Sequence, residues 1–282
     1  MKNLFSKLTI LSTLFALILG NLVVATNSGD ACGTDWPKCN GQYVPDFTKI
    51  NILIEYSHRI FTTSLGFILL LNAILVSKKL KKRHTKSWWP AVTVILLIVQ
   101  SLVGGINVIL GTPIGFTTID VTVSLLLLVS VIYTHTLLES PKEGPKKVIK
   151  KSAHYLLIIT FIEIVIGAFF KHSRMSELLY PGQTDALINN RNFSQMIYSI
   201  HGILGLASIL VTAYLLFLSY KHNNFKIQST LLMFFLLTTA IFGLITKISF
   251  LSPVTSSIHM IFTIISIALT CSISADRKGI GI

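Results

Sequence analysis

Eight long apolar stretches dominate the sequence, and short polar segments separate them. In windows of about 19 residues they lie near residues 5–26, 52–76, 89–110, 117–138, 153–171, 195–219, 230–250 and 255–274. A helix of about 20 apolar residues is long enough to cross the hydrocarbon core of a bilayer. The pattern therefore predicts eight membrane-spanning helices joined by short loops.

Composition supports the same fold class. The chain has 282 residues, of which 52% are hydrophobic and only 12% are charged, and its mean hydropathy is +0.70. Soluble domains are about 45–50% apolar and about 25% charged, so a soluble enzyme is excluded, and so is a disordered chain. We expect an all-α polytopic membrane protein. For the first stretch one alternative stays open, because Met1-Lys2 before an apolar run ending in Val23-Val24-Ala25 also fits a cleaved signal peptide.

The net charge is +13, and the distribution of the basic residues along the chain indicates the membrane topology. The basic residues form short runs between apolar stretches rather than one soluble face, which argues against a nucleic-acid partner. Most of them fall within segments 2–7, 78–86, 142–151, 221–226 and 277–278. The positive-inside rule then places both termini in the cytoplasm and loops 27–51 and 172–194 outside. Because no arginine-rich transit peptide precedes the first stretch, we expect the chain to lie in the lipid of a bacterial or archaeal plasma membrane.

The sequence contains an internal repeat. Three pairs of segments match at similar offsets: Thr117-Thr118-Ile119-Asp120 with Ser256-Ser257-Ile258-His259, Gly105 with Gly243, and Tyr56-Ser57-His58 with Tyr198-Ser199-Ile200-His201. Membrane folds are commonly built from two related halves. We therefore expect two pseudo-repeated four-helix bundles, residues 1–138 and 153–282, joined by a basic cytoplasmic linker at 139–152.

Three histidines lie inside the predicted spans at one level. His58, His201 and His259 are placed about 6–11 Å below the outer surface by the helical rise. A single histidine of this kind is more often a hydrogen-bonded packing residue, but a common depth in repeat-related positions favours a functional site. Imidazoles on facing helices can hold heme iron from both sides. The other histidines near the spans' cytoplasmic ends are expected to be solvated or to snorkel toward water: His84, His135, His154 and His222.

The two halves differ in this respect. His201 and His259 supply two imidazoles in the carboxy-terminal half, whereas the equivalent positions of the amino-terminal half are His58 and Asp120. Iron bound there would be five-coordinate or weakly ligated, which suits chemistry better than electron storage. The sequence thus predicts metal ligation by His58, His201 and His259, with Asp120 doubtful.

Charged residues accompany the first of these histidines. Glu55 lies three residues before His58 on the same helical face, and Arg59 follows directly. A carboxylate beside a cofactor can move protons, and an arginine can pair with a heme propionate. An ordinary ion pair between Glu55 and Arg59 is the alternative. Glu163, in the fifth span, receives no role.

Two of the three cysteines, Cys32 and Cys39, share the outer loop 27–51. Three cysteines are too few for a disulfide scaffold or a four-thiolate metal site. The predicted topology puts this pair in an oxidising compartment, where a disulfide can persist.

The sequence resembles the heme A synthase family over nearly its whole length. The segments that carry the resemblance are Ser28-Gly29-Asp30-Ala31-Cys32, Asp35-Trp36-Pro37-Lys38-Cys39-Asn40-Gly41, Ile54-Glu55-Tyr56-Ser57-His58-Arg59, Gly167-Ala168-Phe169-Phe170-Lys171-His172, and the histidines of the sixth and eighth spans. The most specific part is the outer cysteine pair around Trp-Pro, followed by Glu-x-x-His-Arg.

The resemblance implies a function. The family oxidises the C8 methyl group of heme O to a formyl group, giving heme A for terminal oxidases, and keeps a permanent heme b in its carboxy-terminal half. It implies His201 and His259 as heme b ligands, His58 as a ligand on the substrate side, and Glu55 as a catalytic carboxylate. It also implies a disulfide between Cys32 and Cys39 that relays electrons or only shapes the site. Heme O synthase and terminal oxidase assembly proteins are its candidate partners.

Two departures from the family pattern stand out. Asp120 replaces a fourth histidine, and His135 cannot substitute because it lies about 22 Å further along the helix. Loop 172–194 lacks the second cysteine pair of some bacterial members, which leaves Cys271 as an inert packing residue.

These departures leave competing hypotheses. One is a non-catalytic heme b cytochrome that has lost the substrate site, motivated by Asp120. Another is a thiol–disulfide electron-transfer protein, motivated by Cys32 and Cys39. The sequence does not identify the electron acceptor or the oligomeric state.

Overall fold

The computed structural model describes residues 3–111, 115–139, 147–180, 186 and 188–275. Within these residues it has no β-sheet, and its elements are α1 (Leu4–Ala25), α2 (Ile50–Lys82), α3 (Trp89–Ile109), α4 (Phe116–Thr136), α5 (Lys147–His172), the 3₁₀ helix η1 (Met175–Leu179), α6 (Arg191–Lys221), α7 (Lys226–Ile248) and α8 (Pro253–Ser274). All of the α-helices are long and apolar enough to cross a membrane. The predicted all-α, multi-pass membrane fold is confirmed.

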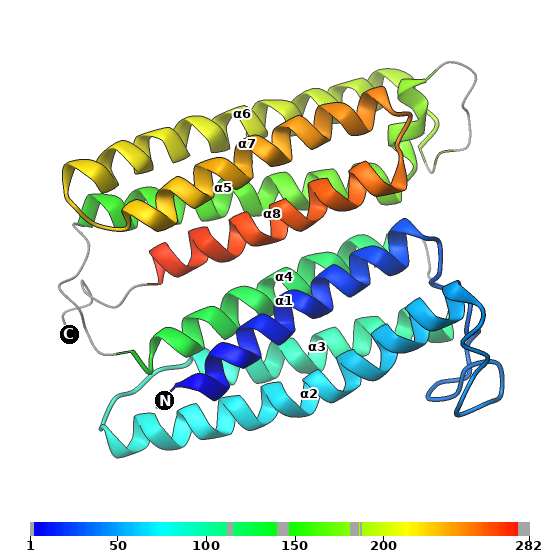
Figure 1. Cartoon of the computed structure of the whole chain (residues 1–282), viewed down its shortest axis with the longest axis horizontal. Helices are drawn as coiled ribbons and strands as arrows, with labels where there is room; N and C mark the ends of the chain where they lie inside the picture. Colours follow the sequence, from blue (N-terminus) through cyan, green and yellow to red (C-terminus); the bar gives the residue numbers. More distant parts are fainter. Residues whose placement is uncertain (1–2, 112–114, 140–146, 181–185, 187, 276–282) are drawn as a thin grey trace. The chain divides into compact units, whose positions relative to one another are not determined.

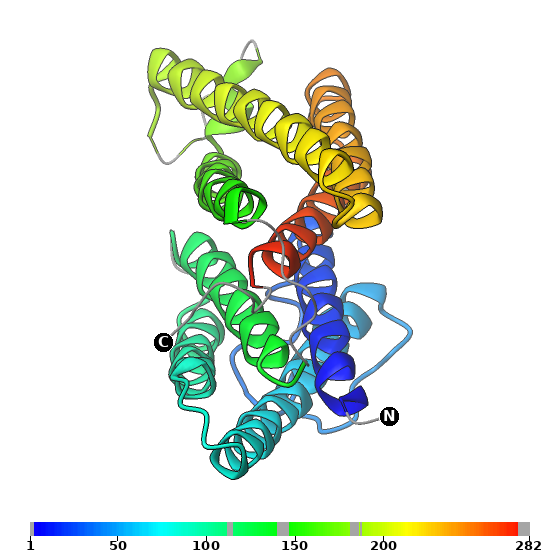
Figure 2. The same ribbon diagram turned by 90° about the vertical axis from the view of Figure 1, so that its left-hand side faces the viewer.

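The chain forms two compact units, residues Met1–Glu139 and Ser140–Ile282, called here the N-terminal and C-terminal units. In the N-terminal unit α1 packs on α2, α2 on α3, α3 on α4, and α4 closes the ring on α1. The C-terminal unit repeats this order with α5 to α8 (Figure 1, and turned in Figure 2). Each unit is therefore an up-and-down four-helix bundle in which the second and fourth helices face one another across the ring.

Helices α2 and α5 extend furthest beyond their predicted spans. Helix α2 continues to Lys82, and α5 begins at Lys147 rather than near residue 153. Lysine is a good helix former, and its long apolar stem lets the ammonium group reach water from a helix that has left the apolar layer. Part of the expected linker 139–152 is therefore helical, and its residues 140–146 lie outside the described residues.

The interior of each bundle combines aliphatic contacts with small polar side chains. In the N-terminal unit Leu65, Leu69 and Val131 form the buried cluster, together with Leu127 and Ala16. Many buried Ser and Thr hydroxyls donate to backbone carbonyls one turn earlier, as Thr13 does to Thr9 at 2.8 Å. Small polar residues let helices approach closely in lipid, so they allow close packing of neighbouring helices within each bundle.

Candidate functional site

The C-terminal unit brings the side chains of His201 and His259 close together. His201 lies on α6 and His259 on α8, and their ring centroids are 6.3 Å apart with an interplanar angle of 70°. The Nδ1 atom of His201 is 3.2 Å from the backbone carbonyl oxygen of Glu163. The Nδ1 atom of His259 is 2.8 Å from the carbonyl oxygen of Thr239. Each ring is thus tied to the neighbouring helix through the same nitrogen.

This arrangement fits a heme with two axial imidazoles. A carbonyl accepts from Nδ1–H, which leaves the Nε2 lone pair of each ring for a metal. A histidine nitrogen binds a metal at about 2.0–2.1 Å and lies about 1 Å from its ring centroid, so two rings flanking one iron have centroids about 6 Å apart. Among the residues the structure describes, no group of three or more His, Cys, Asp or Glu side chains could hold a bare metal ion. A heme needs only two axial side chains.

The outer end of this unit also carries a cation. Lys171, in the last turn of α5, donates from Nζ to the hydroxyl oxygen of Ser256 on α8 at 2.8 Å. Ser256 lies three residues before His259 and therefore on the same side of α8. A positive charge stands near the outer edge of the imidazole pair.

In the N-terminal unit the surroundings of His58 differ from those of His201 and His259. Within the described part of the chain the His58 ring makes no hydrogen bond, and the ring is partly buried between α2 and Gly20 of α1. At the repeat-related position on α4, the Asp120 carboxylate accepts from Nε2 of Gln100 on α3 at 2.6 Å. Gln100 Oε1 is buried and has no hydrogen-bond partner among the described residues. This unit thus has one unrestrained imidazole and a carboxylate–amide pair.

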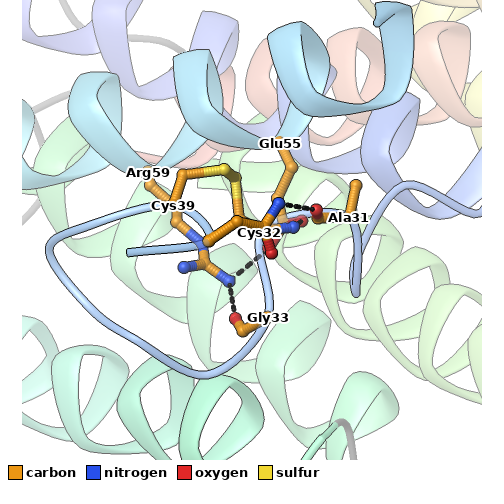
Figure 3. A network of polar contacts seen from close by, with 7 residues as sticks. Ala31, Cys32, Gly33, Cys39, Glu55 and Arg59 are labelled. Carbon is orange, nitrogen blue, oxygen red and sulfur yellow. Dashed lines mark hydrogen bonds and ion pairs between the residues drawn. A yellow bond between two sulfur atoms is a disulfide. The ribbon is translucent and has the colours of Figure 1, made fainter. Parts of the chain in front are cut away.

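Glu55 and Arg59 join α2 to the outer loop (Figure 3). Glu55 Oε2 accepts from the backbone N–H of Cys32 at 2.7 Å, and Glu55 Oε1 pairs with Arg59 Nη2. The same Arg59 nitrogen donates to the carbonyl oxygen of Gly33 at 2.8 Å. The two residues are 3% and 7% exposed. The alternative ion pair is therefore present, but it is buried and anchors the loop, unlike a solvated surface pair.

The outer loop is held in one conformation. Cys32 and Cys39 form a disulfide, so the predicted pairing is confirmed. The Asn40 side chain donates to the carbonyl oxygen of Ala31 at 2.9 Å, and Gly33 has a φ of +66°, a conformation that favours glycine. The Cys32 amide that holds Glu55 thus belongs to a cross-linked turn.

One sequence expectation is wrong. His135 was expected to be solvated or to snorkel toward water at the cytoplasmic rim, but it is only 6% exposed, and its Nε2 lies 3.4 Å from Glu139 Oε1. The amino-terminal end of α1 packs against this part of α4, as the hydrogen bond from Asn3 to the Leu138 carbonyl at 3.0 Å shows. Packing of α1 therefore covers a position that hydropathy places near water. Cys271 is buried, as expected of a packing residue.

Some site residues escaped the sequence analysis. The carbonyls of Glu163 and Thr239 orient the two imidazoles, yet every residue has a carbonyl, so no residue type signals this role. The carboxylate of Glu163 also accepts a hydrogen bond from the hydroxyl group of Ser208 on α6 at 2.8 Å. The repeat does not single out Gln100, because the match of Gly105 with Gly243 pairs Gln100 with Thr238 rather than with Thr239.

Fold and site together define a multi-pass membrane protein of two four-helix bundles, one of which presents a facing pair of imidazoles suited to heme iron. Residues 3–271 match the model of the COX15-CtaA family, described as cytochrome oxidase assembly protein. The chain belongs to this family, and the family predicted from the sequence is confirmed.

Individual relatives agree with this assignment. A protein named heme A synthase from Exiguobacterium sp. (strain ATCC BAA-1283 / AT1b) is 28% identical over 245 residues, which cover 83% of this chain and 79% of the relative. The heme A synthase of Bacillus cereus (strain AH187) is 27% identical over 94% of this chain and 89% of its own length. That of Alkalihalophilus pseudofirmus is 33% identical over 61% of this chain and 60% of its own length.

Proposed function

We propose that this protein is an oxidoreductase that converts the C8 methyl group of heme O to a formyl group, giving heme A for terminal oxidase assembly. Family membership and the relatives' name support the reaction. The observation that carries the proposal is the difference between the units. One has two imidazoles that are each held by a backbone carbonyl, and the other has an imidazole without a hydrogen bond among the described residues and a carboxylate–amide pair at the repeat-related position.

The C-terminal unit is proposed to hold a resident heme b between His201 and His259. When bound there, the heme supplies one-electron redox chemistry. The carbonyls of Glu163 and Thr239 keep both rings in the tautomer that ligation needs. Because both axial positions would be filled by protein, this unit suits electron transfer rather than reaction with substrate.

The N-terminal unit is proposed to bind heme O, with His58 as the ligand to the substrate's iron. No second imidazole stands at the repeat-related position, where Asp120 is engaged by Gln100. One axial side of a bound heme O would therefore face a carboxylate and an amide rather than a strong ligand. A ring that no hydrogen bond restrains can turn to accept and release a substrate.

Glu55 and Arg59 are proposed to act at the same site. Arg59 uses Nη2 for Glu55 and Gly33, whereas its Nη1 is buried without a partner among the described residues. A buried unpaired guanidinium N–H is costly, and a heme propionate would satisfy it with a charge-assisted bond. Glu55, fixed by the Cys32 amide and Arg59, is the proposed catalytic carboxylate that takes up a proton.

The disulfide is proposed to be a structural element of this site. Its direct link to chemistry is the Cys32 N–H that holds Glu55. A closed ring between Cys32 and Cys39 keeps that N–H in place. Heme O synthase and oxidase assembly proteins are the proposed partners.

The chain is proposed to lie in the plasma membrane with both termini in the cytoplasm. The lysines of segments 78–86 and 147–151 would then be cytoplasmic. An amine reagent that cannot cross membranes should label them only after the cells are opened. Labelling in intact cells would reverse the topology.

Heme analysis tests the proposed reaction. The chain is expressed together with a heme O synthase in a host that lacks heme A, and extracted hemes are identified by chromatography and mass. We expect heme A with the wild-type chain and none with an empty vector. The matched variant His58→Ala should accumulate heme O while keeping heme b. Heme A at wild-type levels in that variant would remove His58 from the reaction.

A second candidate function is a heme b cytochrome without catalytic activity, favoured by the Asp120–Gln100 pair. In the same host such a protein would carry heme b but produce no heme A. Asp120→His would then be expected to create activity where the wild type has none. Heme A from the wild-type chain rejects this candidate.

A further inference from the structure

In three of the four helix pairs a glycine lies directly against the candidate ligand imidazole. Gly20 on α1 faces His58, Gly167 on α5 faces His201, and Gly243 on α7 faces His259. In every case the glycine is on the odd-numbered helix and the histidine on the next helix of the chain. The pairing therefore recurs with the internal repeat.

The available space is smaller than one methyl group. A Cβ built on Gly167 would lie 2.8 Å from Cε1, 3.2 Å from Nδ1 and 3.5 Å from Nε2 of His201. A Cβ on Gly243 would lie 3.1 Å from Cε1 and 3.2 Å from Nδ1 of His259. Because packed interiors have little slack, an added methyl group must displace the ring or part the helices.

The rings of the C-terminal unit cannot retreat freely. His201 and His259 are each tied through Nδ1 to a carbonyl on the same helix that carries the facing glycine. A methyl group there would push the ring away from the carbonyl that orients it. His58 has no such bond within the described residues, and a Cβ on Gly20 would meet its Nε2 at 3.2 Å, so this ring can move aside.

The fourth helix pair provides an internal control. Gly105 on α3 corresponds to Gly243, and Asp120 on α4 corresponds to His259. A Cβ built on Gly105 has no neighbour within 4 Å, because Asp120 is short and is held by Gln100. The glycine remains where the imidazole is missing, and the close contact is lost with the ring.

We propose that Gly167 and Gly243 are positioning residues of the C-terminal site: their missing side chains let His201 and His259 lie close against α5 and α7, reach the orienting carbonyls, and keep the separation that one iron requires. That the occupant is heme b rests on the proposed function. The ring positions themselves depend only on this chain.

Alanine variants of the full-length protein test the proposal through its heme. Removing the support of a metal-binding histidine typically weakens affinity about 10–100-fold, so Gly167→Ala and Gly243→Ala should lower heme b retained through purification about tenfold or more, or change its low-spin spectrum. Gly202→Ala, next to His201 but facing open space, and Gly105→Ala are matched controls that should stay within twofold of wild type. Alanine variants at 167 and 243 with wild-type heme content and spectrum would overturn the proposal.

A double-mutant cycle provides a readout that needs no heme. Melting temperatures are measured for wild type, Gly243→Ala, His259→Ala and the double variant, all produced in heme-depleted cells. If the methyl group collides with the ring, Gly243→Ala should lower the melting temperature only while His259 is present. An equal decrease in both backgrounds would mean that Gly243 serves helix packing alone and would refute the proposal.

The two experiments separate the inference from the proposed function. If the cycle shows coupling between Gly243 and His259 but the wild-type chain binds no heme b, the ring-positioning inference stands and the resident cofactor is rejected. Conversely, a heme-loaded wild type without coupling would reject the glycine inference alone. A Gly243→Ala variant too unstable to purify should become purifiable when combined with His259→Ala.

Discussion

The two units use the same four-helix frame but restrain their histidines differently. In the C-terminal unit each imidazole has a carbonyl partner on Nδ1 and a glycine packed against its ring. In the N-terminal unit the His58 ring has no such partner among the described residues, Asp120 replaces the second ring, and the outer loop is cross-linked and tied to α2. A resident cofactor needs fixed ligands, whereas a substrate must enter and leave. The degree of restraint thus distinguishes the proposed cofactor site from the proposed substrate site.

The largest expected effect comes from removing one restrained ring. His259→Ala deletes one of two axial ligands, so we expect heme b in the purified protein to fall at least about tenfold, measured as heme per protein. His222→Ala, which removes a histidine at the far end of α6, is the matched control and should keep wild-type heme. If both variants retained heme b equally, the proposed ligand pair would be wrong.

The complementary change in the other unit should separate chemistry from heme content. His58→Ala is expected to reduce heme A formation by about 100-fold or more, because the proposed substrate ligand is lost and each 1.4 kcal/mol is a factor of ten. Heme b should remain at the wild-type level. Chromatography of extracted hemes measures both quantities in one sample. Simultaneous loss of heme A and heme b would mean that heme b binding and heme A formation are not separated between the two units.

Glu55→Gln tests the carboxylate without changing its shape. An amide can still accept from the Cys32 N–H, but it cannot take up a proton and leaves Arg59 without its counter-charge. We expect heme A formation to fall about 10²–10⁴-fold, the usual contribution of a general base. Because one partner of a buried pair is lost, a lower melting temperature should accompany this change. Activity within threefold of wild type would exclude proton transfer at Glu55.

The smallest effect is expected from the disulfide. In Cys32→Ser combined with Cys39→Ser, the unfolded chain regains about 2–3 kcal/mol of loop entropy, and the Cys32 amide is held less firmly. A structural cross-link predicts a several-fold decrease in heme A formation and a lower melting temperature. Complete loss of activity with an unchanged melting temperature would favour an electron relay instead. Unimpaired function would count against the thiol–disulfide hypothesis.

Hydropathy predicted the helices because lipid imposes one simple rule on a spanning segment: about 20 apolar residues in a helix. All of the predicted spans have a helix at the expected place, and the family is confirmed. The helix ends were less accurate, because lysines extend α2 and α5 past the apolar layer. His135 was misjudged because hydropathy does not report what packs on a helix end.

The repeat pattern led to the histidines but could not reveal how they are held. His201 and His259 meet as the repeat predicts, since the second and fourth helices of a bundle face each other. Their carbonyl partners are backbone atoms, which leave no trace in residue identity. The links from Gln100 to Asp120 and from Cys32 to Glu55 depend on side-chain rotamers and on the path of the loop. Sequence patterns fix neither of these.

The most direct test of the two-site account is a titration of the purified, heme b-loaded protein with heme O in detergent. We predict that one further equivalent binds, that the low-spin spectrum of heme b does not change, and that the added heme O carries a single imidazole and is high-spin. His58→Ala should abolish this uptake while keeping heme b. Displacement of heme b by heme O, or equal uptake by wild type and His58→Ala, would contradict the division between a fixed cofactor site and an open substrate site.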